Sequence, residues 1–284
     1  MKIKNRGKKQ TAIVLSIFAL AVLASSLVVG LASAHMLYIE ANDKPDIPSV
    51  QAARINLGHP NIPVELKAPR IEEAKLYGPG DTVKDLKLLE KANYSVVYFL
   101  LNQNGDHIIG AKRVGIYDPA WHNLTGIIPL QLIIDSAKIV IRAGGESNTE
   151  KSGMIPWAKV IGQEWEIVPL VDPLSLHVGD TFKAALLYKG SPTEGVYATA
   201  HATQDIHSPA KAQMGTTAED GTFSIEVNKP GMWQVVAEYT VEESGTWNAT
   251  YDIVRQDKMN YLKGDEIVYE QVRCRSTLTF YASP

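Results

Sequence analysis

Cysteine is nearly absent from this sequence, since Cys274 is the single thiol among 284 residues. One thiol cannot form an intrachain disulfide, so burial of apolar side chains has to stabilise the fold. It also excludes zinc-ribbon and iron–sulfur sites, which need several thiolates. Cys274 lies in the alternating stretch EQVRCRSTLTF, which predicts a half-buried residue on a strand.

The motifs of common enzyme classes are missing as well. The chain has no Gly-x-Ser-x-Gly nucleophile turn, no His-Glu-x-x-His helix and no Gly-rich phosphate loop. Scattered acids and serines in a β-rich chain do not make a catalytic set. The sequence therefore predicts that the protein is not an enzyme.

The N-terminus has the pattern of a secretory signal peptide. An uncharged run from Thr11 to Ser33 follows five basic residues, which are Lys2, Lys4, Arg6, Lys8 and Lys9. Ala32 and Ala34 supply the small residues of a cleavage site, so we expect residues 1–34 to be removed and the mature chain to begin at His35. The alternative is an uncleaved anchor, because the apolar run is long enough to cross a bilayer. Membrane contact would then occur through the leader alone.

Basic charge is scarce in the predicted mature chain. Subtracting the five leader residues from the 28 basic residues leaves 23 against 31 acidic residues, a net charge of −8. Nucleic-acid binding needs a basic face that displaces counterions, so this balance argues against it. An acidic chain suits a protein that is secreted to the periplasm or the extracellular space.

No long helical period is evident in the mature chain, and short β-rich runs are broken by Gly, Pro, Asn and Asp. These runs predict strands at residues 94–101, 137–143, 181–188, 222–227, 233–241 and 276–282. The turns QNGD (103–106) and EDGT (219–222) have the composition of hairpin turns. Residues 85–93, DLKLLEKAN, are the one stretch that favours a short helix.

The predicted fold class is all-β, with two β-sandwich (immunoglobulin-like) domains after the signal peptide. The polar stretch GGESNTEKSG and the fresh strand signal WEIVPLVDP place a domain boundary between them. We therefore expect an N-terminal β-rich domain over residues 35–165. An immunoglobulin-like sandwich is expected over residues 166–284, whose strand spacing is typical of that fold.

Several short segments occur in one order along the mature chain. They are AHMLYIE at 34–40, GHP at 58–60, WEIVPLVDP at 165–173, LHVGD at 176–180, LLYKGSPTEGV at 186–196, DGTFSIEVNKPGMWQVVAEY at 220–239 and STLTF at 276–280. In this order they resemble an exported family of undefined function whose members often carry the label of a periplasmic nickel-uptake component (NikM/NikK type). The resemblance implies a secreted two-part β protein involved in metal transport. The chain differs from the family in an insertion-like stretch at 240–272.

Cleavage before His35 would create a chelating group, because the new α-amine lies beside the imidazole of the same residue. The amine has a pKa of about 7.7–8 and the imidazole one of about 6.5, so both bind metal near neutral pH. Neutral nitrogen ligands suit nickel, copper and zinc. His59, in the turn GHP, is the first candidate for a further ligand, and His107 and His122 are the alternatives. The alternative is that these are ordinary side chains, with His59 bonded to a neighbouring loop and His107 and His122 solvated in turns.

A second, weaker metal site is suggested by HATQDIH. If this stretch is an extended strand, His201, Asp205 and His207 point to similar sides, because side chains alternate along a strand. His177, which precedes VGD, is interpreted as a strand-edge residue.

The leading functional hypothesis is an exported, non-enzymatic protein that binds a divalent transition metal, with nickel favoured over copper and zinc. It would support metal uptake by passing the ion to a membrane importer. The alternative is an extracellular structural or adhesive β-sandwich module that binds carbohydrate or protein. Five tryptophans could supply a sugar-stacking platform, although most are expected in the core: Trp121, Trp157, Trp165, Trp233 and Trp247.

Overall fold

The protein is an all-β chain, as the sequence predicts. The computed structural model describes residues 36–58, 68–145, 155–205, 211–254 and 260–284. None of these described residues lies in an α-helix, and the helical elements among them are short 3₁₀ turns such as η1 (Pro119–His122) and η3 (Thr203–Asp205). Residues 36–284 form one compact unit.

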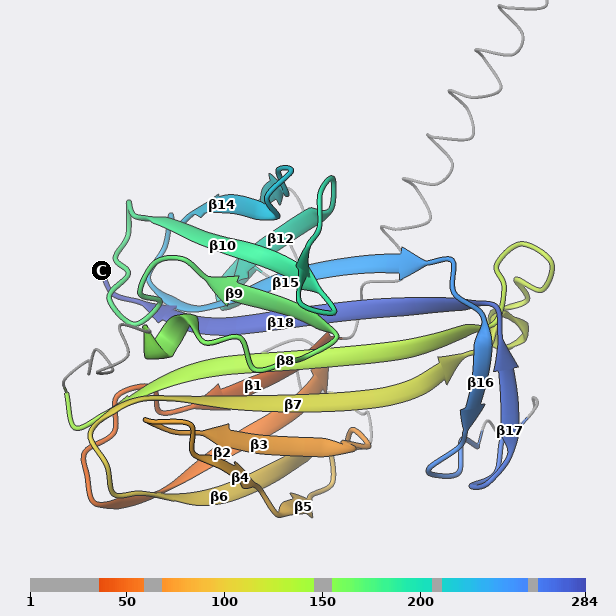
Figure 1. Cartoon of the computed structure of the whole chain (residues 1–284), viewed down its shortest axis with the longest axis horizontal. Coiled ribbons are helices and arrows are strands. Elements are labelled where there is room, and N and C mark those ends of the chain that lie inside the picture. Colours follow the sequence, from red (N-terminus) through yellow and green to blue (C-terminus); the bar gives the residue numbers. More distant parts are fainter. Residues whose placement is uncertain (1–35, 59–67, 146–154, 206–210, 255–259) are drawn as a thin grey trace, which may run out of the picture. The chain divides into compact units, whose positions relative to one another are not determined.

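One sheet of eight strands organises the molecule (Figure 1). Its order is β13-β12-β15-β18-β8-β7-β3-β4. The strands are β3 (Glu73–Tyr77), β4 (Val83–Asp85), β7 (Gly105–Tyr117), β8 (Gln131–Ala143), β12 (Tyr197–Ala202), β13 (Gln213–Thr216), β15 (Gly231–Val241) and β18 (Gln271–Ala282). All neighbours are antiparallel except β18 and β8, which run parallel from the pair Gln271–Gln131 to the pair Thr279–Ile139.

Two smaller sheets pack against this sheet. The first has the order β1-β2-β6-β5, from β1 (Met36–Ala41), β2 (Ser49–Gly58), β5 (Leu88–Glu90) and β6 (Tyr94–Leu101). The second has the order β11-β10-β14 with β9 also paired to β10, from β9 (Trp165–Pro169), β10 (Thr181–Tyr188), β11 (Ser191–Pro192) and β14 (Thr222–Glu226). Each encloses its own apolar core, so two sandwiches share the eight-stranded sheet.

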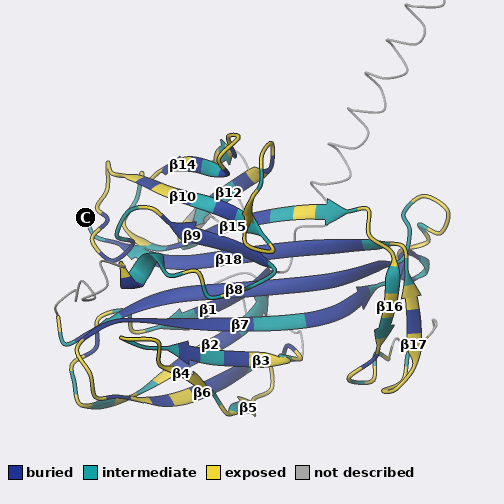
Figure 2. Ribbon diagram, viewed as in Figure 1, coloured by how far each residue is buried: buried dark blue, intermediate teal, exposed yellow. Residues whose placement is uncertain are grey.

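The shared strands β8 and β18 are buried on both faces, as Figure 2 shows along most of their length. On β8, Ala137, Ile139 and Ile141 belong to the core beneath β1, β2 and β6. Lys138, between two of them, instead reaches Glu166 of β9. Successive side chains of a strand point to opposite faces, so the two small sheets cover opposite faces of β8. This double burial matches the apolar character of LIIDSAKIVIRA.

Most of the predicted strands are confirmed, but the role predicted for two turns is wrong. Residues 94–101 and 181–188 are β6 and β10 in full. The turns at 103–106 and 219–222 do not close hairpins, because β6 and β7, and likewise β13 and β14, lie in different sheets. Asn-Gly and Asp-Gly here form turns in connections that pass from one sheet of a sandwich to the other.

The predicted helix at 85–93 is wrong. The chain there forms the end of β4 and then β5, which pairs with β6 from Leu88–Val97 to Glu90–Ser95. The insertion-like stretch at 240–272 includes a separate two-stranded sheet of β16 (Gly245–Asn248) and β17 (Glu266–Tyr269). Within the described part of the chain, no helix has the length and apolar character needed to cross a membrane.

The predicted domain boundary at 165/166 falls at the first two residues of β9. Strands from both sides of it join the eight-stranded sheet through the β8–β18 pairing. The division of the mature chain into domains 35–165 and 166–284 stays a prediction. Cys274 is a strand residue, as expected, but its side chain is fully buried in the core rather than half-buried.

Candidate functional site

The strand pair β1–β2 carries the residues to which the first two predicted metal ligands are attached. Its antiparallel register runs from the pair Met36–Gly58 to the pair Ala41–Ala53. His35 precedes Met36 and His59 follows Gly58, and both histidines lie outside the described residues. The described part of the site is therefore the last residue pair of these strands, Met36 and Gly58.

The side chain of Met36 packs on Val236 of β15. Glu238 lies two residues further along β15 and therefore on the same face of the sheet. Its Oε2 atom is buried without a hydrogen-bond partner, and the guanidinium Nε of Arg275 lies 3.9 Å away. A carboxylate oxygen near the start of β1 thus retains capacity to accept a further interaction.

The side chains of β1 alternate between two faces. Leu37 and Ile39 are buried in the core, whereas Tyr38 and Glu40 point to the other face. This second face is not simply solvent-exposed, because only 4% of Tyr38 is accessible. Burial raises the pKa of the Tyr38 hydroxyl well above its usual range, with a smaller contribution from the charge of Glu40.

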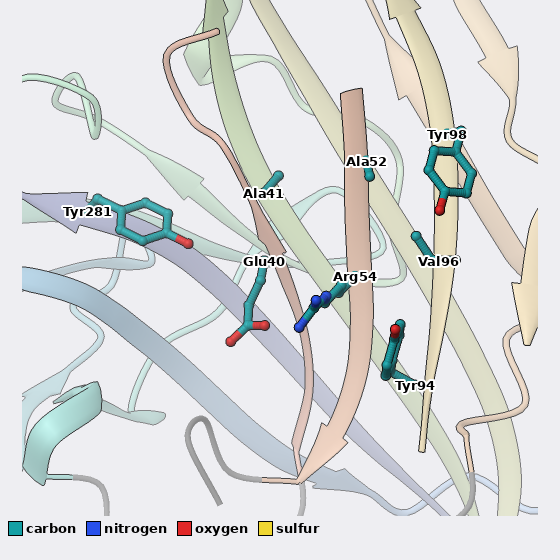
Figure 3. A pocket seen from close by; sticks show the side chains of 8 residues that line it. All are labelled: Glu40, Ala41, Ala52, Arg54, Tyr94, Val96, Tyr98 and Tyr281. Atoms are coloured by element: carbon teal, nitrogen blue, oxygen red, sulfur yellow. The ribbon is translucent and has the colours of Figure 1, made fainter. Parts of the chain in front are cut away.

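A hollow of about 410 Å³ opens on this second face of β1, β2 and β6 (Figure 3). The register forms a grid of side chains in which Arg54 lies opposite Glu40 on β1 and opposite Val96 on β6. In the adjoining row, Ala52 lies opposite Tyr98. We call this feature the tyrosine hollow; its lining consists of Glu40, Arg54, three tyrosines (Tyr94, Tyr98 and Tyr281) and the smaller residues Ala41, Ala52 and Val96.

The charged groups of the tyrosine hollow are held in defined positions. The amide Nδ2 of Asn56 donates to Oε2 of Glu40 at 3.3 Å. The guanidinium carbon of Arg54 lies 5.0 Å from the ring centroid of Tyr94, a cation–π distance. Burial raises the pKa of Glu40, while the amide of Asn56 and the charge of Arg54 oppose this shift. Burial, with the nearby charge of Glu40, also raises the pKa of Tyr281 to about 12.

His107 and His122 lie too far apart to share an ion. His107 is near the start of β7, whereas the ring of His122 stacks on Tyr117 at its end, with centroids 5.3 Å apart. Ten residues of strand separate His107 from Tyr117, or about 33 Å. His107 is buried and its Nδ1 lies 3.0 Å from the carbonyl oxygen of Gly105, whereas His122 is exposed.

The second predicted metal site rested on an extended strand, and that premise is wrong. β12 ends at Ala202 and the 3₁₀ turn η3 follows, so Asp205 does not continue the alternation that begins at His201. His207 lies outside the described residues. His177 is exposed, and its Nδ1 lies 3.7 Å from Asp180. Within the described ranges, no three His, Cys, Asp or Glu residues are grouped so that they could hold a metal.

None of the five tryptophans is exposed, and the exposed aromatic residues in the described part of the chain are tyrosines. Trp165 and Trp233 are fully buried and Trp121 nearly so. Tyr98 is 55% exposed. A signal for the tyrosine hollow exists in YSVVYFLL, because Tyr94 and Tyr98 are four residues apart on one strand and so share a face. The contributions of Arg54 and Tyr281 depend on pairings between distant strands, which the sequence does not display.

Comparison with known proteins gives one family and several distant folds. The family model described as a domain of unknown function (DUF4198) matches residues 32–241, and this match ends with the last residue of β15. No curated protein matches the sequence. The D0–D1 domain of intimin is 8% identical over 86% of this chain and 97% of that chain, with a TM-score of 0.20. A trypsin-activated alpha-2-macroglobulin from Escherichia coli is 12% identical over 86% of this chain and 15% of that chain (TM-score 0.21), and a marsupial T cell receptor is 8% identical over 86% and 74% (TM-score 0.22).

Proposed function

The chain belongs to the DUF4198 family, and we propose that its mature form is an exported, non-enzymatic protein that binds a divalent transition metal through His35 and His59. Nickel is the favoured ion, and copper and zinc are the alternatives. The protein would deliver the ion to a membrane importer. Both histidines lie outside the described residues, so support comes from the residues to which they are attached.

The observation that carries the proposal is the pairing of Met36 with Gly58. Directly opposed residues of an antiparallel pair have Cα atoms about 4.5–5.5 Å apart. His35 is bonded to Met36 and His59 to Gly58, and consecutive Cα atoms are about 3.8 Å apart. Met36 and Gly58, to which the two proposed ligands are covalently attached, are thus opposed on neighbouring strands, and this pairing supports a shared site. Two residues 24 positions apart in sequence thereby become candidates for one site.

The chemistry of the ligands favours a transition ion over calcium or magnesium. A free α-amine and two imidazoles are neutral nitrogen donors, which suit nickel, copper and zinc, whereas calcium and magnesium prefer oxygen. Each donor must be deprotonated to bind, so affinity should fall as the pH drops below about 8 and again below about 6.5. The amine is available only if the leader has been cleaved before His35.

Glu238 offers one further donor that fits such an ion. Its Oε2 atom is buried and has no hydrogen-bond partner, and Glu238 shares a sheet face with the residue on which Met36 packs. Oε2 is ion-paired with Nε of Arg275 at 3.9 Å but receives no hydrogen bond, so it can accept one more interaction. The proposal therefore includes Glu238 as an additional ligand or as the acceptor for a ligand's N–H group.

The test starts from protein secreted by its native host. Intact mass establishes whether the chain begins at His35. Nickel, copper and zinc are then titrated into this species, into a version with one alanine added before His35, and into His59→Ala and Glu238→Gln. His177→Ala is the matched control, because it removes an exposed histidine from a loop between β9 and β10.

We expect the added alanine and His59→Ala each to weaken binding by more than the roughly 10–100-fold that changes outside the first ligand shell cause. Glu238→Gln should weaken it less, and His177→Ala should have no effect. Equal affinity of the trimmed and extended chains, or no binding by either, would show that the N-terminal site is wrong. A purified chain that still carries its leader would exclude the amine as a ligand.

A further inference from the structure

The tyrosine hollow is a candidate binding surface, and it is separate in chemistry from the proposed metal site. It has one carboxylate, one guanidinium and three phenol rings, and no histidine. Its volume of about 410 Å³ lies within the range of about 300–1,000 Å³ that is usual for small-molecule sites. Between the larger side chains it is lined by Ala52 and Val96, which share the sheet face of Arg54 (Figure 3).

The aromatic walls present flat apolar surfaces with polar edges. Tyr98 is 55% exposed on β6, and Tyr281 approaches from β18 on the other side of β1, as Figure 3 shows. A phenol ring has an apolar body and a hydroxyl that can donate or accept a hydrogen bond. Such rings suit a ligand that is flat and apolar on its faces but carries hydroxyl groups around its rim.

The polar groups at the centre supply matched donors and acceptors. The guanidinium of Arg54 has N–H groups in a fixed plane, and the carboxylate of Glu40 accepts hydrogen bonds. Asn56 and the ring of Tyr94 hold these two side chains in place before any ligand arrives. Fixed donors and acceptors lose little conformational entropy when they bind neighbouring hydroxyl groups.

The charge balance selects a neutral ligand. One acidic and one basic group line the hollow, so their charges cancel. The guanidinium of Arg54 already occupies the face of the Tyr94 ring, so this face is not available to a cationic ligand. Glu40, opposite Arg54 in the register, disfavours an anionic one.

We infer that the tyrosine hollow binds a neutral saccharide, with a sugar ring against Tyr98 and its hydroxyl groups bonded to Arg54 and Glu40. This activity does not depend on the metal site. It would fix the exported protein to a polysaccharide.

The test uses the full mature chain on an array of clustered oligosaccharides built from glucose, mannose, galactose and N-acetylglucosamine, together with sialylated and sulfated chains. EDTA is present throughout, so that a failed metal site cannot change the outcome. Calorimetry with the soluble form of the best-bound neutral oligosaccharide then gives the affinity. Tyr98→Ala is the principal variant, because an exposed ring can be removed without opening the core.

At least one neutral oligosaccharide should bind, and Tyr98→Ala and Arg54→Met should each weaken it by about tenfold or more. Tyr197→Ala is the matched control, since Tyr197 is a 65% exposed tyrosine on β12 outside the hollow, and its affinity should equal that of the unmodified chain. Circular dichroism and the melting temperature establish that Tyr98→Ala is folded. Retention of acidic glycans alone, the absence of any glycan binding, or unchanged affinity in folded Tyr98→Ala would each overturn the inference.

Discussion

Lys138 of β8 and Glu166 of β9 form an ion pair that is sealed from solvent between two sheets. Each side chain is 1% exposed, and the ammonium of Lys138 donates to Oε1 of Glu166. The carboxylate also accepts backbone N–H groups of Ile161 at 2.8 Å, Gly162 at 3.0 Å and Gln163 at 3.1 Å. This arrangement anchors the chain that leads into β9 onto the shared strand β8.

The substitution Lys138→Met should destabilise the protein by about 3–5 kcal/mol, because it leaves Glu166 as a buried charge without a counter-ion. Burial lowers the pKa of the Lys138 ammonium, and the attraction of Glu166 opposes this shift. Each charge thus compensates the other in the interior, and removal of either one leaves its partner uncompensated. Urea unfolding at pH 7 measures the effect. Lys183→Met is the control, since Lys183 is exposed on β10 and should change stability by less than about 0.5 kcal/mol. Equal losses in the two variants would contradict the role of the ion pair.

The positions of the regular strands are encoded in short stretches of the sequence. The runs YSVVYFLL and TFKAALLY predict β6 and β10 to the residue, because alternation and flanking turn residues act over a few positions. The stretch at 85–93 was predicted as a helix, yet it forms parts of two short edge strands. Pairing with β3 and β6 overrides its weak local preference, and a strand of three residues leaves almost no pattern to read.

Pairings between distant segments could not be predicted from the sequence. Gln131 and Gln271 are 140 positions apart, yet they begin the parallel pairing that joins the two sandwiches. The tyrosine hollow likewise needs β1, β2, β6 and β18 together. For the proposed metal site, the leader pattern predicts a free amine at His35, and the register of β1 with β2 supports its association with His59.

Asp135 of β8 should stabilise the protein through the buried Arg275 and the partly buried Arg113. It is fully buried, and Arg275 binds it in a bidentate manner, with Nε–Oδ1 at 2.6 Å and Nη2–Oδ2 at 3.0 Å; Arg113 also donates to Oδ2. Burial would raise the pKa of Asp135, but the charges of Arg275 and Arg113 outweigh it and hold the pKa below the usual 3.8. We expect Asp135→Asn to cost about 3–5 kcal/mol at pH 7.

The pH dependence of this effect has a defined sign. A carboxyl whose pKa is lower in the folded state stabilises the protein above the unfolded pKa, and this contribution is lost as the pH falls through the folded value. The difference between the unmodified chain and Asp135→Asn should therefore shrink as the pH is lowered from 7 to below 3.8. Urea unfolding across this range measures it, with Asp85→Asn, an exposed residue of β4, as the control. A difference that does not depend on pH would point to packing rather than charge.

His107 should make the protein less stable in mild acid. Burial lowers the pKa of its imidazole below the usual 6.5, although the carbonyl of Gly105 and the charge of Asp106 raise it and that of Lys84 lowers it further. Below pH 6.5 the unfolded chain binds a proton that the folded chain does not, so stability falls as the pH decreases. The slope from one such group cannot exceed about 1.4 kcal/mol per pH unit.

The substitution His107→Gln removes this contribution, so its free energy of unfolding should vary less between pH 7 and pH 5 than that of the unmodified chain. Chemical denaturation at intervals of half a pH unit would show the difference. His177→Gln removes an exposed histidine and should keep the original dependence. Parallel curves for the unmodified chain and His107→Gln would exclude His107 as the source of acid sensitivity.

Gly221 in the turn before β14 should tolerate no side chain. Its φ is +75°, which L-residues rarely adopt, and an added Cβ would lie 2.8 Å from the carbonyl oxygen of Leu186 and 3.1 Å from Cβ of Pro192. The contact to Leu186 involves backbone, and the N–H of Leu186 in turn donates to the carbonyl of Gly221 at 2.9 Å. The overlap cannot be relieved without moving β10 away from the turn.

Gly190 provides a control in which an added side chain causes backbone strain but no steric overlap. It also has a positive φ, +81°, but an added Cβ there would meet no atom within 4 Å. Gly190→Ala should therefore cost only the strain of the left-handed conformation, about 1–2 kcal/mol, and Gly221→Ala should cost at least about 1–2 kcal/mol more. Thermal and urea unfolding of both variants provide the measurement. Equal losses would mean that β10 and the turn shift apart at no cost, which the hydrogen bond between Leu186 and Gly221 argues against.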